Sequence, residues 1–283
     1  MRSIFHNKTI LTLSAALVLI IVAYLWLTSP LPAPKENVLS DSNYYIAHAG
    51  GAIDGKTYLN CEEALLQSLQ NGYKYVELDL GLTSDSVLVC LHDWADFNKK
   101  ATNNDTADID RPLSKEEFLQ RKIQGKYTPM TLERVTEIRK HHPFTLVTDK
   151  ISNTETLNRF FSNGRDQLMV EAFKLSDYAN LKLAGYVPMM SLSSFNYSIL
   201  FKVFIYYPIN YHGKIDWICV HSTSDMKSLR MVKRLFGCKV AMFTSNSPSF
   251  FEEHLGREID LLYTDNWNFN TKTNNDSVNC TTY

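Results

Sequence analysis

Cysteine is scarce in this chain of 283 residues, and its five cysteines show no paired C-x-x-C spacing. This scarcity excludes a disulfide-dense scaffold and argues against a structural zinc site. The chain also has no excess of charge of one sign, because it contains 29 basic and 30 acidic residues and has a formal net charge of −1. A dedicated nucleic-acid-binding protein needs a basic face for its phosphate contacts, so nucleic acid is not expected as a partner.

The composition is that of an ordinary globular protein. Hydrophobic residues make up 45% and charged residues 21% of the chain, which excludes a mainly disordered or collagen-like protein. At about 100–200 residues per domain, the length allows one large domain or two small ones.

One long uncharged run, from Ile10 to Leu27, separates the start of the chain from the rest. As a helix rising about 1.5 Å per residue it would span roughly 27 Å, close to the thickness of the hydrocarbon core. A cleaved signal peptide usually has an apolar core of about 7–15 residues and a small-residue cleavage site, which the aromatic end of this run lacks. The run therefore favours a transmembrane signal-anchor over 10–27, with a cleaved signal peptide as the alternative.

Basic residues fix the expected orientation of this anchor. Arg2 and Lys8 predict a cytoplasmic N-terminus over 1–9, which puts the folded part on the extracytoplasmic side, periplasmic or extracellular. A proline-rich linker over 28–42 follows, and the polar segment 270–283 is predicted to be a disordered tail.

Between residues 43 and 269 short β-rich runs alternate with polar or amphipathic stretches. The eight candidate strands are 44–51, 75–83, 144–150, 167–173, 186–193, 217–222, 239–246 and 259–267. A further run over 87–94 follows the second strand after a tight turn and predicts a hairpin arm. Eight strands alternating with helices predict an α/β fold, a single (β/α)8 TIM barrel over 43–269, although a doubly wound sheet also alternates.

Three of the intervening segments have patterns of their own. Residues 61–71 and 131–142 are predicted helices, the second with Thr131 as its N-cap and Pro143 as its stop. The aromatic-rich segment 195–211 is interpreted either as a buried helix or as a loop that inserts at the bilayer surface.

Polar residues stand at the carboxyl ends of the predicted strands, where such barrels carry their functional groups. They are His48, Glu77, Asp79, His92, Asp149, Lys150, Glu171, His221 and Asp265. Glu77 and Asp79 are two residues apart and share one strand face. Two carboxylates on one face repel each other unless a proton or a cation lies between them, so this pair indicates a hard divalent metal ion.

Several motifs, taken in order, resemble the glycerophosphodiester phosphodiesterase family, which belongs to the phosphatidylinositol-phospholipase-C-like phosphodiesterase barrels. They are IAHAGG (46–51), Asn60 ahead of a helix, VELDLGLTSDSVLVCLHDW (76–94), TPMTLERV (128–135) and YTD (263–265). The resemblance extends over 44–267, and the ordered set of His48, Glu77, Asp79 and His92 is its specific part.

The resemblance implies a role for each of these residues. His48 and His92 would be the acid/base pair, one taking a proton from the attacking hydroxyl and the other protonating the leaving oxygen. Histidine suits either role because it titrates near neutral pH. Glu77 and Asp79 would bind Mg²⁺ or Ca²⁺, which neutralises the phosphodiester charge.

The third metal-binding acid remains open between Asp149 and Glu171. In the family this acid stands two residues before the strand lysine, a position occupied here by Thr148. Asp149 would face the opposite side of a regular strand unless a bulge re-aimed it.

Contacts to the substrate phosphate are expected from Lys150, Asn60, His221 and Asp265, with a structural salt bridge as the alternative role of Lys150. The family's arginine after the first histidine is replaced by Ala49, which indicates a divergent member.

The sequence as a whole predicts a metal-dependent phosphodiester hydrolase. Its expected substrates are extracytoplasmic and glycerophosphodiester-like, either phospholipid headgroups or glycerol-phosphate groups of envelope polymers. Two alternatives stay open: an inactive barrel that binds a phosphorylated ligand or partner at the membrane, and a phospholipase D-like lyase on the same fold.

Overall fold

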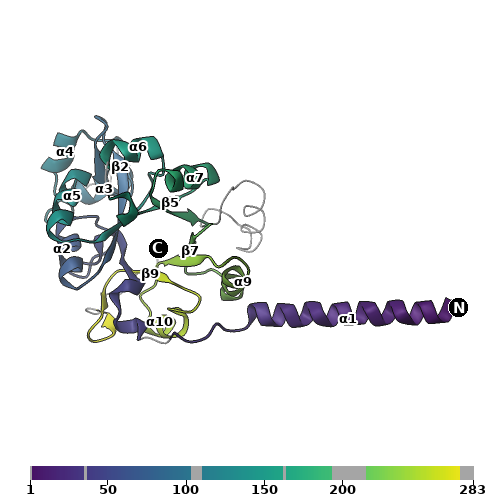
Figure 1. Ribbon diagram of the computed structural model, residues 1–283. Coiled ribbons are helices and arrows are strands. Elements are labelled where there is room, and N and C mark those ends of the chain that lie inside the picture. The colour runs from purple at the N-terminus through teal and green to yellow at the C-terminus, as the bar shows by residue number, and fades with distance from the viewer. Residues whose placement is uncertain (1, 35–36, 103–109, 162–163, 193–214, 275–283) are drawn as a thin grey trace.

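The computed structural model describes residues 2–34, 37–102, 110–161, 164–192 and 215–274. Eight parallel strands form a closed barrel surrounded by helices (Figure 1). The strands are β1 (Tyr45–Ala47), β2 (Tyr75–Leu82), β4 (Thr145–Asp149), β5 (Leu168–Ala172), β6 (Val187–Ser191), β7 (Trp217–His221), β8 (Lys239–Phe243) and β9 (Leu261–Thr264). Their order is β1-β9-β8-β7-β6-β5-β4-β2, and the pairing of β1 with β2 closes the ring. The predicted (β/α)8 barrel and its eight strands are confirmed.

A short hairpin extends the barrel at β2. Strand β3 (Leu88–Cys90) pairs antiparallel with β2, in the register that joins Leu80 to Cys90. This is the predicted hairpin arm, and its end carries His92 to the mouth of the barrel.

The helices include the two that the sequence predicts. The helices are α1 (Arg2–Thr28), α2 (Glu62–Gln70), α3 (Trp94–Thr102), α4 (Lys115–Gln120), α5 (Leu132–His141), α6 (Thr154–Phe160), α7 (Leu175–Leu183), α9 (Met226–Phe236) and α10 (Pro248–His254). Helices α2 and α5 confirm the predictions, and the Thr131 side chain accepts the backbone N–H of Arg134 as an N-cap. The segment 195–211 lies outside the described residues.

Successive side chains of each strand point alternately into the barrel interior and outward, into the layer beneath the helices. The interior is filled by one or two residues from each of seven strands: Ile46, Val147, Met169, Met189, Cys219, Ala241, Leu261 and Tyr263. The outward residues Val76, Leu78 and Leu80 of β2 are buried in the layer between the barrel and its helices. The remaining face of β2 carries Glu77 and Asp79, which therefore point into the barrel.

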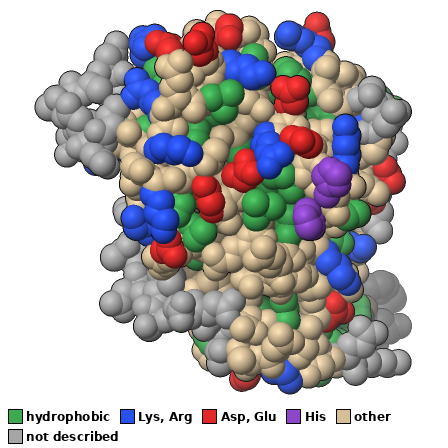
Figure 2. Space-filling model, turned by 90° about the vertical axis from the view of Figure 1, so that its left-hand side faces the viewer, with side chains coloured by type: hydrophobic (Ala, Val, Ile, Leu, Met, Phe, Trp, Pro, Cys, Tyr) green, Lys and Arg blue, Asp and Glu red, His purple; other side chains and the backbone are tan. Residues whose placement is uncertain are grey.

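Charged side chains of both signs are interspersed on the face covered by α2, α4 and α5 (Figure 2). Arg134 of α5 forms an ion pair with Glu62 of α2 at 2.6 Å and another with Glu137 at 2.7 Å. These half-exposed pairs are screened by solvent and add little stability individually.

Helix α1 extends away from the barrel, and its C-terminal end contacts α9 (Figure 1). Arg234 of α9 donates hydrogen bonds to the carbonyl oxygens of Leu27 and Ser29, at 2.8 and 2.7 Å. Within the part of the chain whose residues are described, we find no helix both long enough and apolar enough to span a membrane. The predicted transmembrane segment over 10–27 is thus not supported; the side chains of α1 are described only from Thr12 onward.

The C-terminal segment differs from its prediction. Residues 273–274 form strand β11 (Thr273–Asn274), which pairs antiparallel with β10 (Trp267–Asn268). The prediction of a disordered tail from residue 270 is therefore wrong for residues 273–274, which pair with the segment that follows β9.

Gly51 has a backbone conformation that other residues rarely adopt, with φ 93° and ψ 176°. A Cβ at this position would lie 2.1 Å from the Ser68 hydroxyl oxygen. We expect Gly51→Ala to lower the free energy of unfolding by about 1–3 kcal/mol for backbone strain and by about 1–3 kcal/mol for overpacking. Urea unfolding measures this loss.

Gly55 provides the matched control, because it also has a positive φ, 72°, but a Cβ there would meet nothing within 4 Å. Gly55→Ala should cost only the backbone part, about 1–2 kcal/mol. An equal loss in the two variants would contradict the steric account of Gly51.

Candidate active site

Three carboxylates meet at the carboxyl ends of β2 and β4. Glu77, Asp79 and Asp149 each offer an oxygen, and these oxygens all lie within 4.8 Å of one another. The register between β2 and β4 brings the three carboxylates together, because it pairs Glu77 with Val147 and Asp79 with Asp149. Val147 faces the barrel interior, and Asp149, two residues further on, shares its face. The expectation that Asp149 needs a bulge to reach the site was therefore wrong.

The three acids are withdrawn from water. Glu77 and Asp79 are each 3% exposed, and the side chain of Asp149 is 18% exposed. Burial raises the pKa of Glu77 and of Asp149 well above the ordinary carboxyl range, and the negative charge of Asp79 raises both further. When the three acids are ionised their negative charges repel one another, and a bound cation would reduce this repulsion.

Lys150 is the basic residue beside this cluster, with its ammonium 3.4 Å from a carboxylate oxygen of Asp149. Burial opposes the charge of Lys150, but the carboxylates of Asp149 and Asp79 outweigh it and raise its pKa. Lys150 therefore carries a positive charge at the site, and this single charge does not neutralise three carboxylates.

The cluster has the donor set of a divalent metal site. Three carboxylate oxygens within one small volume match the hard oxygen ligands that Mg²⁺ and Ca²⁺ prefer. In addition, Oδ1 of Asp149 is buried and has no hydrogen-bond partner among the described residues. A buried carboxylate oxygen without a donor is costly unless a ligand satisfies it, so these residues fit a divalent cation.

Loop residues hold the carboxylates in place. The amide of Asn60 donates to a carboxylate oxygen of Asp79 at 2.8 Å, and its carbonyl oxygen accepts the Asp79 N–H at 3.0 Å. The N–H of Ala49 donates to Glu77 at 2.7 Å. Asn60, predicted as a phosphate contact, is thus placed against Asp79.

His48 lies directly after β1 and is 7% exposed. Its Nδ1 is 3.1 Å from a carboxylate oxygen of Asp265 and 3.2 Å from the hydroxyl of Thr244. Asn246 donates to the other oxygen of Asp265 at 2.6 Å. Asp265, predicted as a phosphate contact, is thus placed against the predicted acid/base histidine.

Thr244 and Asn246 are site residues that sequence reasoning missed. Both follow β8, so their place at a carboxyl end was the signal that could have found them.

His92 stands at the end of the β3 arm, with Nδ1 2.7 Å from a carboxylate oxygen of Asp93 and a side chain 34% exposed. The ring of Tyr58 contacts the His92 ring edge to face, with 5.5 Å between centroids. The same ring contacts His48 at 4.4 Å. Tyr58 therefore joins the two predicted acid/base residues, and sequence reasoning missed it too.

Glu171 and His221 have other partners. Glu171 accepts hydrogen bonds from the Tyr263 hydroxyl at 3.0 Å and the Cys219 thiol at 3.2 Å, and it is not one of the three clustered acids. His221 is exposed, and its Nδ1 lies 2.8 Å from the hydroxyl of Thr223. The structure thus favours Asp149 over Glu171 as the third acid of the cluster.

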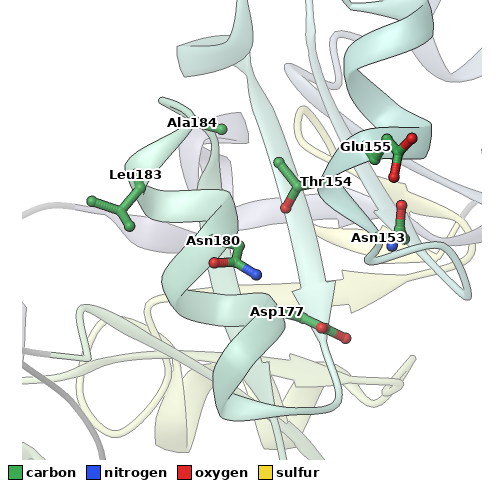
Figure 3. Close-up of a pocket in the computed structure, with 7 residues that line it drawn as sticks. All are labelled: Asn153, Thr154, Glu155, Asp177, Asn180, Leu183 and Ala184. Carbon is green, nitrogen blue, oxygen red and sulfur yellow. The ribbon is translucent and has the colours of Figure 1, made fainter.

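A shallow polar groove of about 520 Å³ lies between α6 and α7 (Figure 3). Its walls are formed by Asn153, Thr154, Glu155, Asp177, Asn180, Leu183 and Ala184. No residue of the acidic cluster and neither predicted histidine lines this groove, so it is separate from the candidate site.

The raised pKa values of Glu77 and Asp149 predict a pH-dependent effect of metal. Both acids bind protons more tightly in the folded chain, so the metal-free protein loses stability as pH rises from the ordinary carboxyl range through the raised values. A divalent cation needs the deprotonated acids, so the increase in Tm on adding Mg²⁺ or Ca²⁺ should grow with pH. Thermal unfolding between pH 5 and 8, with chelator or with metal, measures this.

The variant Glu77→Gln isolates this effect from the titration of other acids. It should flatten the pH dependence of the metal-induced Tm shift. A shift of equal size at every pH in the natural protein would contradict this account of the acidic cluster.

The closed barrel thus carries three clustered carboxylates and two histidines near the carboxyl ends of its strands. The sequence model of the glycerophosphoryl diester phosphodiesterase family matches residues 55–184, which include the elements from α2 to α7. Over these residues the chain is similar to this family of phosphoric diester hydrolases. Among curated proteins, no match to this chain is found.

Solved structures confirm the fold. A glycerophosphoryl diester phosphodiesterase from Agrobacterium tumefaciens, described as putative, shares 17% identity at a TM-score of 0.61, over 79% of this chain and 93% of its own. A phosphodiesterase from Oleispira antarctica, in complex with the product sn-glycerol-3-phosphate, shares 20% identity at 0.58, over 78% and 92%. The glycerophosphodiester phosphodiesterase of Thermotoga maritima shares 20% identity at 0.59, over 78% and 94%.

Proposed function

We propose that this protein hydrolyses glycerophosphodiester-like substrates with a divalent metal ion held by Glu77, Asp79 and Asp149. The observation that carries the proposal is the convergence of these three carboxylates at one end of the barrel. His48 and His92, which share contact with Tyr58, are the proposed acid/base pair.

A carboxylate orients the ring of each of these two histidines. Each has its Nδ1 beside a carboxylate, Asp265 for His48 and Asp93 for His92. A carboxylate at Nδ1 favours the tautomer with its proton there, which leaves Nε2 of each ring to exchange a proton with the substrate. One ring accepts the proton of the attacking hydroxyl, and the other protonates the leaving oxygen.

Positive charge at the site supports the same reaction. A divalent cation bound by the three carboxylates would neutralise the phosphoryl charge and stabilise the transition state. Lys150 adds a second positive charge beside Asp149. The attacking hydroxyl belongs either to water or to the glycerol of the substrate, and in the second case a cyclic phosphate is formed first.

A glycerol-phosphate substrate is supported by the Oleispira antarctica structure, which contains sn-glycerol-3-phosphate. We expect ³¹P NMR to show glycerophosphocholine and glycerophosphoglycerol converted to a phosphomonoester in the presence of Mg²⁺ or Ca²⁺. A cyclic phosphate as the final product would favour the lyase alternative. No turnover of any diester, with metal binding retained, would favour an inactive barrel that binds a phosphorylated ligand.

We also propose that the barrel lies on the extracytoplasmic side of a membrane. Support comes from the uncharged run between Ile10 and Leu27 and from apolar side chains that α1 exposes, with Leu13 65% and Leu19 69% exposed. Full-length protein should then sediment with membranes and resist extraction by carbonate. Its recovery in the supernatant, or protection of the barrel from protease added to the extracytoplasmic face of the membrane, would contradict this location.

A further inference from the structure

Tyr58 lies between the two proposed acid/base residues. Its ring contacts the His48 ring at 4.4 Å and 87°, and the His92 ring at 5.5 Å and 69°. The side chain is 36% exposed, so a ligand at the mouth of the barrel can reach it. A substrate that is to exchange protons with both imidazoles must therefore bind next to this ring.

The backbone fixes Tyr58 in this position. Its φ of 61° is in the left-handed region, which is rare for a bulky residue and is maintained only where the surroundings impose it. The Lys100 ammonium donates a hydrogen bond to the Tyr58 carbonyl oxygen at 2.7 Å. Two residues further on, Asn60 also has a positive φ, 49°, and is bound to Asp79. The loop is thus bound to α3 at Tyr58 itself and to the acidic cluster two residues further on.

The Tyr58 hydroxyl has no hydrogen-bond partner among the described residues, in contrast to other tyrosines of the chain. Tyr127, in the long loop before α5, donates to Asp54 at 2.9 Å, and Tyr263 donates to Glu171 at 3.0 Å. Burial raises the pKa of the Tyr58 phenol, and the negative charges of Asp79 and Glu77 raise it further. The hydroxyl therefore keeps its proton and can act as a donor.

A phosphodiester at this site needs hydrogen-bond donors, because its phosphoryl oxygens approach three carboxylates. Two nearby donors each have a carboxylate partner: Lys150 contacts Asp149, and the Asn60 amide donates to Asp79. Ala49, directly after His48, is fully buried and has no polar side chain. The Tyr58 hydroxyl, by contrast, has no partner among the described residues, so its O–H is available to a bound ligand.

We infer that Tyr58 is a substrate-binding residue, whose hydroxyl donates a hydrogen bond to a non-bridging phosphoryl oxygen of the diester held between His48 and His92. This inference deepens the proposed function and rests on it for the identity of the ligand.

The test is calorimetry of sn-glycerol 3-phosphate binding to the full chain with saturating Mg²⁺. Tyr58→Phe keeps the ring between the histidines and removes only the donor. A hydrogen bond to a charged oxygen contributes about 1.5–3 kcal/mol, so Tyr58→Phe should weaken binding by about 10-fold or more. During turnover the same variant should raise KM more than it lowers kcat.

Tyr186→Phe is the matched control, because it breaks the 2.9 Å hydrogen bond to Asn158 and lies just before β6, at the end of the barrel opposite the candidate site. It should lower Tm and leave the Kd of the natural protein unchanged, whereas Tyr58→Phe should change Kd and leave Tm unchanged. Equal Kd values for Tyr58→Phe and the natural protein would overturn the inference, as would no binding by the natural protein. Binding that depends on Tyr58, without turnover of any diester, would overturn the proposed function and leave this inference standing.

Discussion

Asp149→Asn is expected to abolish divalent metal binding and to reduce phosphodiesterase activity by about 10³-fold, since metal stabilisation of a phosphoryl transition state is worth several kcal/mol. Asparagine keeps the size of the side chain but removes one of the three charges that meet within 4.8 Å. Asp79→Asn should give a similar loss, because Asp79 is paired with Asp149 in the strand register. Calorimetry with Mg²⁺ or Ca²⁺ measures the first effect and initial rates measure the second.

Two further variants sharpen this test. Asp177→Asn removes a carboxylate that lines the groove between α6 and α7 and should leave metal affinity unchanged (Figure 3). Glu171→Gln should weaken metal binding much less than Asp149→Asn, because Glu171 is bound by Tyr263 and Cys219. If Glu171→Gln abolished metal binding and Asp149→Asn did not, Glu171 would be the third ligand and our assignment would be wrong.

His48→Ala and His92→Ala are each expected to lower kcat by about 10²–10⁴-fold, the usual contribution of a positioned general acid or base. The metal affinity of both variants should be unchanged, because neither ring is among the three clustered metal ligands. The loss in the double variant should be less than the product of the two single losses, as is common for residues that act as a unit. Initial rates with saturating metal measure all three variants.

His141→Ala, at the exposed end of α5, serves as the control for removal of an imidazole. Asp265→Asn should lower kcat less than His48→Ala, because it disturbs only the orientation of the His48 ring. Full activity in either single histidine variant would remove that residue from the proposed acid/base pair.

The sequence was sufficient to predict the barrel, because its strands are short β-rich runs that the alternation with helices separates clearly. It also placed Glu77 and Asp79 on one face, since a spacing of two residues determines this in any strand. The contribution of Asp149 was harder to predict, because it depends on the register between β2 and β4, which two separate segments determine together.

Other parts of the site depend on loops and on burial. Tyr58 reaches the histidines through a left-handed backbone in a loop that has no sequence period. Asn60 and Asp265 were singled out as phosphate contacts, yet they hold Asp79 and His48. Which partner a polar side chain finds depends on three-dimensional proximity, and a single sequence does not contain that information.

The most direct test of the central claim uses the full chain stripped of metal by a chelator and assayed with bis(p-nitrophenyl) phosphate. Our account predicts no turnover without metal, recovery on adding Mg²⁺ or Ca²⁺, and no recovery in Asp149→Asn. Turnover that persists at full rate in the metal-free protein would contradict the role of the acidic cluster as a catalytic metal site.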